Sequence, residues 1–155
     1  MRAATFALLL VLTGCASNRP QTAATLAPEV AVTGSYDEVW QNLLNATSRL
    51  GFVPQRTDKE SGVFVAEHIS APGELREQWL DCGRRDASLG GPNFARVWNL
   101  TPTLSAFVNR GEGNAHTVRL DVSGTAYEEM MGTRVEQPCV SQRALEREIA
   151  ARLVE

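Results

Sequence analysis

Two stretches of the chain have apolar residues at helical spacing. In the first stretch they recur every three or four residues: Val39, Leu43, Ala46 and Leu50. This spacing predicts an amphipathic helix over roughly 36–50. Ser35 and Glu38 form the Ser-x-x-Glu pattern of a capping box at its start, and Gly51 suits the position just after a helix. We therefore expect both ends of this helix to be well defined.

The second stretch lies near the carboxyl end of the chain. Its apolar residues are Leu145, Ile149 and Leu153, each four residues from the next. They predict a stripe along one face of a helix that packs on the rest of the domain. Ser141 is the expected cap at the start of this helix.

Around these helices, β-branched and aromatic residues predict strands. The expected strands cover residues 29–33, 52–56, 63–69, 78–82, 95–109 and 116–127. Apolar and polar residues alternate most clearly over 116–127, which indicates a strand with one solvated face. Pro102 predicts an edge position or a bulge. Residues 83–93 and 128–138 are expected to be loops or connections, because they hold few apolar side chains.

The expected order of elements is β-α-β-β-β-β-β-α. Mostly short turns join the strands after the first helix, so the sheet should be antiparallel. The final helix has to bury its apolar stripe on that sheet. We therefore predict a single α+β domain over residues 29–155, with one antiparallel β-sheet packed against two helices.

The first residues carry a targeting pattern and are not expected to belong to the fold. Arg2 precedes an apolar run over 3–12, which has the length of a secretory signal core and is too short to cross a bilayer. The run ends in Leu-Thr-Gly-Cys, which resembles a bacterial lipobox, the signal of lipid-anchored proteins. This resemblance implies removal of a 1–14 signal peptide, acylation of Cys15 and a flexible tether over 15–28. An ordinary signal peptide followed by a buried cysteine is the alternative.

The residues after Cys15 bear on the destination. Ala16 and Ser17 resemble the sorting context of outer-membrane lipoproteins. Two or more acyl chains would give stable attachment. We therefore expect a protein that is anchored to the cell outer membrane by lipid and faces the periplasm.

The composition and charge of the chain argue against a nucleic-acid-binding protein and against a transmembrane helix. The chain has 155 residues, with 15 Lys and Arg against 18 Asp and Glu, and a net charge of −3. It has no cluster of basic residues, so a general nucleic-acid-binding function is not expected. It also has no apolar run long enough for a transmembrane helix.

Cys82 and Cys139 remain as a pair once Cys15 carries the lipid. In an oxidising compartment an even pair predicts a disulfide, which would contribute roughly 4 kcal/mol in the chain-entropy account. Two buried free thiols are the alternative. His68 and His116 do not have metal-ligand spacing relative to these cysteines, so we expect no metal and no cofactor.

The sequence contains no nucleotide-binding, metalloprotease or nucleophile-elbow motif. We interpret His68 and His116 as partly exposed strand residues, with a shared catalytic site as the alternative. Ser141 would need an acidic partner and an oxyanion hole, and the sequence identifies neither. The prediction is therefore a protein without catalytic activity.

Four residues are candidates for contacts with a partner or ligand: Trp79, Arg84, Arg85 and Trp98. The two arginines lie in the expected glycine-rich loop, where they could pair with an acidic group. A solvated loop is the alternative. Trp40, Trp79 and Trp98 could line a groove between the sheet and a helix, although core aromatic residues are the more common case.

The local pattern is similar to that of a known family. The Ser35–Trp40 helix start, the Gly51-Phe52 exit, the hairpin over 58–65 and the element order resemble the helix-grip domains of the outer-membrane assembly lipoprotein BamC. The resemblance covers residues 29–69 by local pattern and 29–155 by element order. It implies a helix-grip-like sheet and a role in assembling outer-membrane proteins. BamC has two such domains whereas this chain has room for one, and the cysteine pair is not part of that pattern.

These features together predict a membrane-anchored periplasmic lipoprotein that acts as a non-catalytic interaction or accessory module in the cell envelope. Its expected contacts are the membrane, through the acyl chains, and an envelope protein. The alternative is a binding protein for a lipid or other apolar ligand, held in a groove between sheet and helix.

Overall fold

The computed structural model describes residues 27–69, 77–83, 99–130 and 133–154. In these ranges the strands are β1 (Glu29–Thr33), β2 (Val53–Asp58), β3 (Val63–Glu67), β4 (Leu80–Asp81), β5 (Asn99–Leu100), β6 (Thr103–Arg110), β7 (Ala115–Met130) and β8 (Thr133–Ser141), and the helices are α1 (Tyr36–Arg49) and α3 (Ala144–Leu153). The strands form one antiparallel sheet. The predicted fold class, a single antiparallel sheet packed against helices, is confirmed.

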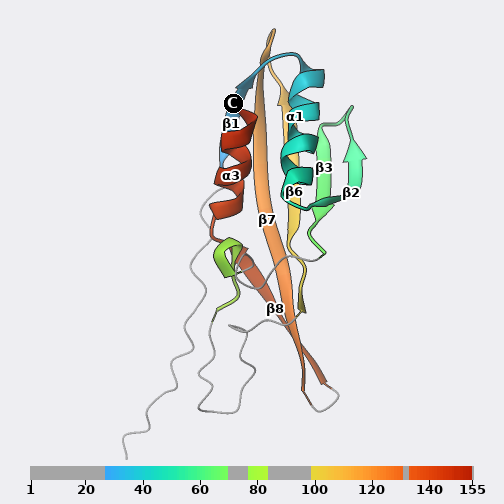
Figure 1. Cartoon of the computed structure of the whole chain (residues 1–155), viewed down its shortest axis with the longest axis vertical. Helices are drawn as coiled ribbons and strands as arrows, with labels where there is room; N and C mark the ends of the chain where they lie inside the picture. Colours follow the sequence, from blue (N-terminus) through green and yellow to red (C-terminus); the bar gives the residue numbers. More distant parts are fainter. Residues whose placement is uncertain (1–26, 70–76, 84–98, 131–132, 155) are drawn as a thin grey trace, which may run out of the picture.

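Strand β7 is the strand that pairs with the most neighbours in the sheet. The strand order is β2-β3-β6-β7-β8-β4, and β1 and β5 also pair with β7. One edge of β7 pairs first with β6 and then with β5, while its other edge pairs first with β1 and then with β8 (Figure 1). With 16 residues, β7 is long enough to serve these different neighbours.

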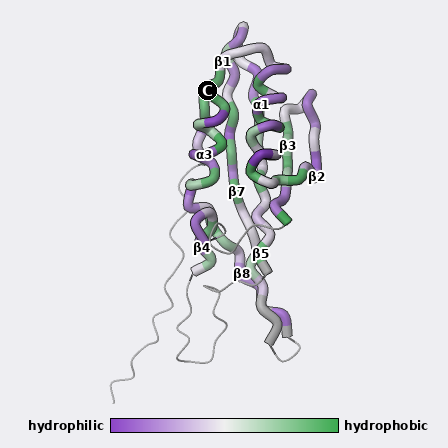
Figure 2. Tube along the Cα trace, viewed as in Figure 1, coloured by the Kyte–Doolittle hydropathy of each residue, from purple (hydrophilic) through white to green (hydrophobic). Residues whose placement is uncertain are grey.

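Both helices lie on the same face of the sheet (Figure 1). Side chains alternate between the two faces along a strand, so β6 and β7 direct every second residue toward the helices. Fully buried side chains from the sheet and from both helices form the core: Leu43, Phe64, Leu104, Leu120, Leu145 and Ile149. Burying each such side chain stabilises the fold by about 1.5–3 kcal/mol. Figure 2 shows that hydrophobic positions concentrate in the part of the sheet that the helices cover.

Helix α1 has the ends that the sequence predicts. The Ser35 hydroxyl accepts a hydrogen bond from the Glu38 N–H at 3.3 Å, and the Glu38 carboxylate accepts one from the Ser35 N–H at 2.8 Å. This reciprocal capping box satisfies backbone N–H groups that a helix leaves without partners at its start. Gly51, just after the helix, has a φ of 82°, a conformation that glycine adopts readily.

The capping box makes a prediction about pH. Hydrogen bonds from the backbone N–H and then the hydroxyl of Ser35 lower the pKa of the Glu38 carboxyl below its ordinary value. A group with a lowered folded-state pKa contributes stability above its unfolded pKa and loses that contribution as the pH falls through the folded-state pKa. We therefore expect Glu38→Gln to be less stable than the native chain at neutral pH, and this difference to vanish in acid. Urea unfolding across the acid range checks this, with Glu112→Gln as an exposed control, and a pH-independent difference would contradict it.

Two expected strands differ from the observed ones. The strand expected over 95–109 is divided into β5 and β6, because Pro102 has no N–H to donate to a ladder; residues 95–98 lie outside the described residues. The strand expected over 78–82 is reduced to β4, which follows one helical turn over 77–79.

The largest difference concerns residues 128–138. They were expected to be a connection, but residues 128–130 form the end of β7 and residues 133–138 form most of β8, while 131–132 lie outside the described residues. This part of the hairpin extends past the helices as a two-stranded ribbon (Figure 1). A strand that no helix covers needs no alternating apolar residues, so the pattern used to recognise strands is missing there.

Candidate functional site

A cluster of buried polar side chains lies where α3 meets one edge of β7. Along this edge β1 pairs with β7 as far as Arg119, and β8 begins at Gly124. Between the two strands, Glu146 of α3 reaches the sheet, and its Oε1 accepts a hydrogen bond from the backbone N–H of Val122 at 3.1 Å. The Glu146 carboxylate thus accepts a backbone hydrogen bond that a neighbouring strand would otherwise accept.

Glu146 is fully buried and gathers its donors on one oxygen. Besides the Val122 N–H, Oε1 accepts hydrogen bonds from the Ser141 hydroxyl at 2.5 Å and from Arg143 Nη1 at 2.9 Å. Removing a carboxylate from water is strongly unfavourable unless donors and an opposite charge surround it. These three donors offset part of the cost of burying Glu146, whose Oε2 has no hydrogen-bond partner among the described residues.

Arg143 connects this carboxylate to the other face of the sheet. Its Nη1 also donates to Asp121 Oδ1 at 2.9 Å, and Asp121 lies on the face opposite the helices. Burial alone would lower the pKa of Arg143, but hydrogen bonds to Asp121 and Glu146 and their charges raise it above its ordinary value. The guanidinium therefore stays positively charged and connects Glu146 on one face of the sheet with Asp121 on the other.

The expected role of Ser141 as the cap of the last helix is wrong. Arg143 is the residue that precedes α3, and its side chain makes no capping bond. The Ser141 hydroxyl accepts a hydrogen bond from the Arg143 N–H at 2.9 Å and donates to Glu146. Arg143 has a φ of 62°, which costs a non-glycine residue about 1 kcal/mol. The hydrogen bonds of the Arg143 N–H to Ser141 and of its guanidinium to Asp121 and Glu146 offset that cost. The cluster therefore holds α3 on the sheet.

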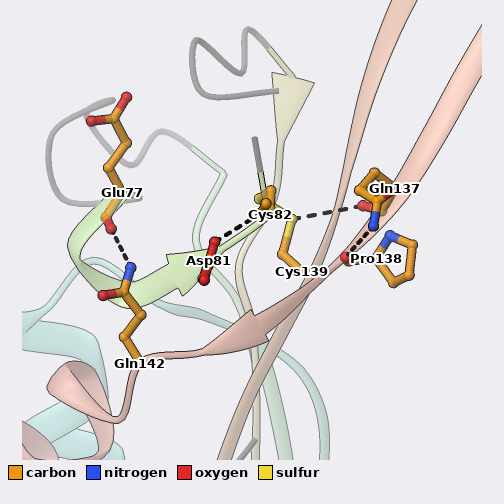
Figure 3. Close-up of a disulfide and its surroundings, with 8 residues drawn as sticks. Glu77, Asp81, Cys82, Gln137, Pro138, Cys139 and Gln142 are labelled. Atoms are coloured by element: carbon orange, nitrogen blue, oxygen red, sulfur yellow. Dashed lines mark hydrogen bonds between the residues drawn. A yellow bond between two sulfur atoms is a disulfide. The ribbon is translucent and has the colours of Figure 1, made fainter. Parts of the chain in front are cut away.

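The disulfide predicted between Cys82 and Cys139 is confirmed, with an S–S distance of 2.05 Å. It lies beside the short ladder in which Leu80 of β4 pairs with Ser141 of β8. Figure 3 shows the bridge between the segment that holds β4 and strand β8. The cross-link therefore attaches that segment to the base of the ribbon.

The attached segment places Trp79 against the end of α1. Gln142 holds its backbone, because the Gln142 N–H donates to the Trp79 carbonyl at 2.9 Å and Nε2 donates to the Glu77 carbonyl at 2.6 Å (Figure 3). The ring centroid of Trp79 lies 6.0 Å from that of Phe52 and 5.6 Å from that of His68. Trp79, a candidate for contact with a partner or ligand, is a core residue with 4% exposure.

The two histidines, expected to be partly exposed, are buried. His68 follows β3 and packs at the C-terminal end of α1, where a Cβ on Gly51 would lie only 2.7 Å from its Nε2. His116 of β7 packs against Tyr36, the first residue of α1, with ring centroids 5.7 Å apart. A helix of 14 residues is about 21 Å long. The histidines therefore lie at opposite ends of α1, and the alternative of a shared catalytic site is wrong.

We expect that the fold can be stabilised by replacing His116. Both of its ring nitrogens are buried and have no hydrogen-bond partner among the described residues. A desolvated polar group without a partner costs about 1–3 kcal/mol. We therefore expect His116→Phe to raise the free energy of unfolding by about 1 kcal/mol, and His116→Ala, which opens a cavity, to lower it. Thermal denaturation of both variants checks this, and a destabilised phenylalanine variant would contradict it.

Of the remaining candidate residues, one lies in the core and the others lie outside the described residues. Trp40 is a core residue whose ring lies edge-on to Phe64, with centroids 6.4 Å apart. The other candidates, Cys15, Arg84, Arg85 and Trp98, lie outside the described residues. Trp40 and Trp79 are therefore core residues, which was the more common case for aromatic residues, and a contact role of Trp98 stays a prediction.

The described ranges contain no group of three or more His, Cys, Asp or Glu residues that could hold a metal ion. None of the helices in these ranges has the length and the apolar composition of a membrane-spanning helix.

The ribbon of β7 and β8 is the feature that the sequence reasoning missed. It consists of residues 124–130 paired with 133–139. Arg134 lies over the Tyr127 ring, 4.0 Å from its centroid, and pairs with Glu136 at 2.7 Å. The contact of Arg134 with Tyr127 crosses from β8 to β7, and the ion pair with Glu136 holds the Arg134 side chain from within β8. These contacts order the ribbon without a helix. The β-branched and aromatic residues on both strands were the signal that could have identified it.

Comparison of the chain with protein-family models, with curated proteins and with solved structures gives no match.

Proposed function

We propose that this chain is a lipoprotein of the bacterial cell envelope whose folded domain is a non-catalytic module that binds another envelope protein. In this proposal Cys15 carries the lipid, and the domain faces the periplasm from the outer membrane. The process that it serves is the assembly of outer-membrane proteins.

The observation that carries the proposal is the ribbon of β7 and β8. A two-stranded ribbon is at best marginally stable in water when nothing packs on it. Here it projects beyond the helices (Figure 1), and β4 and the disulfide attach it at its base. Apart from Ala126 and Tyr127, which pair with β5, the outer backbone edges of the ribbon can pair with an added strand, which is a common mode of protein recognition.

Two features of the sequence support the location and the process. The Leu-Thr-Gly-Cys pattern that ends at Cys15 supports a lipid anchor. The likeness of residues 29–69 to the helix-grip domains of BamC supports a role in outer-membrane protein assembly. The buried polar cluster around Glu146 fits this proposal, because its charges are used to hold the fold together.

Photo-crosslinking in cells tests the binding role of the ribbon. A photoreactive amino acid at Glu136, an exposed position of β8, should give a crosslinked product with one envelope protein. The matched control is the same amino acid at Arg147, an exposed position of α3, which should not give that product. Equal labelling from both positions, or no defined product from Glu136, would contradict the proposal.

The anchor has its own test. We expect Cys15→Ser to block processing and to move the protein from the detergent phase to the aqueous phase in a phase-partition assay, because the acyl chains provide the affinity for the membrane. Unchanged partitioning of this variant would remove the anchor from the proposal and leave the role of the ribbon to the crosslinking result.

A further inference from the structure

The face of the sheet opposite α1 and α3 combines apolar and charged residues in an ordered pattern. Val63 and Val65 of β3 and Phe107 of β6 are partly exposed on this face. Both helices pack on the other face (Figure 1). We call the region around these three residues, between β2 and β7, the open face.

Backbone pairing places the residues of the open face in two rows across four strands. The first row is Asp58, Val63, Phe107 and Arg119. The second row is Arg56, Val65, Ser105 and Asp121. The first row runs from an acid on β2 to a base on β7, and the second runs from a base on β2 to an acid on β7. The four charged corners therefore alternate in sign around an apolar centre.

A surface with this alternation is complementary to a second copy of itself. A two-fold axis along the strands, between β3 and β6, would place Asp58 opposite Arg119 of the second copy and Arg56 opposite Asp121. The same axis would place Val63 opposite Phe107 of the second copy. Each corner would then face the opposite charge, and apolar side chains would meet at the centre.

A two-fold axis in the plane of the sheet but perpendicular to the strands also brings opposite charges together. An axis across the strands, between the two rows, would place Asp58 opposite Arg56 of the second copy and Arg119 opposite Asp121. Val63 would then face Val65. Both axes leave the strands of the two sheets aligned, which is the usual way in which two sheets pack face to face.

We propose that two copies of this chain associate face to face through the open face, as a dimer with two-fold symmetry. The charged corners are available for this contact. Arg56 and Arg119 are exposed, and the side chain of Asp121 is 49% exposed although it pairs with Arg143. The Arg119 guanidinium lies 5.0 Å from the centroid of the Phe107 ring, so it already covers part of the apolar centre in a single copy. Because the contact spans only four strands, it falls at the small end of stable interfaces, and we expect a dissociation constant of about micromolar order.

Co-purification of two differently tagged full-length copies from mild detergent tests the dimer. The native copies should be recovered together. Arg119→Glu would place like charges opposite each other with either axis, so joint recovery should fall about tenfold or more. Arg147→Glu makes the same charge change on the exposed side of α3 and should leave recovery unchanged. Independent purification of the native copies, or equal recovery with both variants, would overturn the proposal.

Paired charge exchanges identify the axis. Arg119→Glu with Asp58→Arg should restore recovery if the axis runs along the strands, whereas Arg56→Glu with Asp58→Arg should keep recovery if it runs across them. Restoration by neither pair would overturn the charge pattern as the basis of association. Asp58 also accepts a hydrogen bond from the Ser61 N–H at 3.1 Å, so circular dichroism must show that the exchanged chains are folded.

A last variant separates this dimer from the envelope partner. Phe107→Thr removes the aromatic centre without a change in charge, and it should also reduce joint recovery of the two tagged copies. The crosslink from Glu136 reports the envelope partner on the ribbon and should persist in the Arg119→Glu variant. Failure of one proposal is therefore distinguishable from failure of the other.

Discussion

Replacing Glu146 with alanine should lower the free energy of unfolding by about 3–5 kcal/mol, because it leaves buried groups without a partner. The Val122 N–H and the Ser141 hydroxyl would lose their acceptor, and Arg143 would lose one of its two carboxylates. The edge of β7 would then have no partner at the point where α3 is attached. Urea unfolding, followed by circular dichroism, measures the change.

A matched control lies two residues further along the same helix. Glu148 is exposed and pairs with Arg152 at 2.9 Å, so Glu148→Ala should change stability by only about 0.5 kcal/mol or less. Glu146→Gln keeps an oxygen acceptor and loses the charge, and its effect should fall between those of the two alanine variants. Equal losses for Glu146→Ala and Glu148→Ala would show that the buried cluster does not hold α3 on the sheet.

Removal of the disulfide should have the second large effect. Changing Cys82 and Cys139 together to alanine should lower the free energy of unfolding by roughly 4 kcal/mol, since the bridge closes a long loop in the unfolded chain. The two residues are 57 positions apart in sequence. The segment that holds Trp79 would also lose its covalent link to β8, so near-ultraviolet circular dichroism should change together with stability.

The redox state of the native chain gives the control for this result. A reducing agent should destabilise the native chain to the level of the double variant, and it should not affect the double variant itself. Cys15→Ser, which does not touch the bridge, should keep the native stability of the domain to within about 0.5 kcal/mol. A loss below about 1 kcal/mol in the double variant would contradict the role given to the disulfide.

Elements whose signals are local could be predicted from the sequence. The capping box of Ser35 and Glu38 and the glycine after α1 gave both ends of that helix, because these interactions involve residues close together in the chain. The apolar stripe of α3 was correct for a similar reason. The pairing of Cys82 with Cys139 followed once the targeting pattern accounted for the remaining cysteine.

The errors share a different physical origin. Ser141 was expected to cap α3, and its hydroxyl serves the buried Glu146 and the Arg143 N–H. The histidines were expected to be partly exposed, yet Tyr36 of α1 packs against His116, and Phe52 and Trp79 pack against His68. In each case the outcome depends on which element packs nearby, and neighbouring residues in the chain carry no signal of that.

The amino-acid order was sufficient for the fold class, the limits of the first helix and the cross-link, since hydrophobic period, caps and the cysteine count act locally or leave few alternatives. The ribbon of β7 and β8, the carboxylate that replaces a strand at the edge of β7 and the charge pattern of the open face depend on the register of strands far apart in sequence. Register is established by long-range pairing and packing, and no short window of the chain contains it. For this protein, the surfaces proposed to bind other chains belong entirely to that second group.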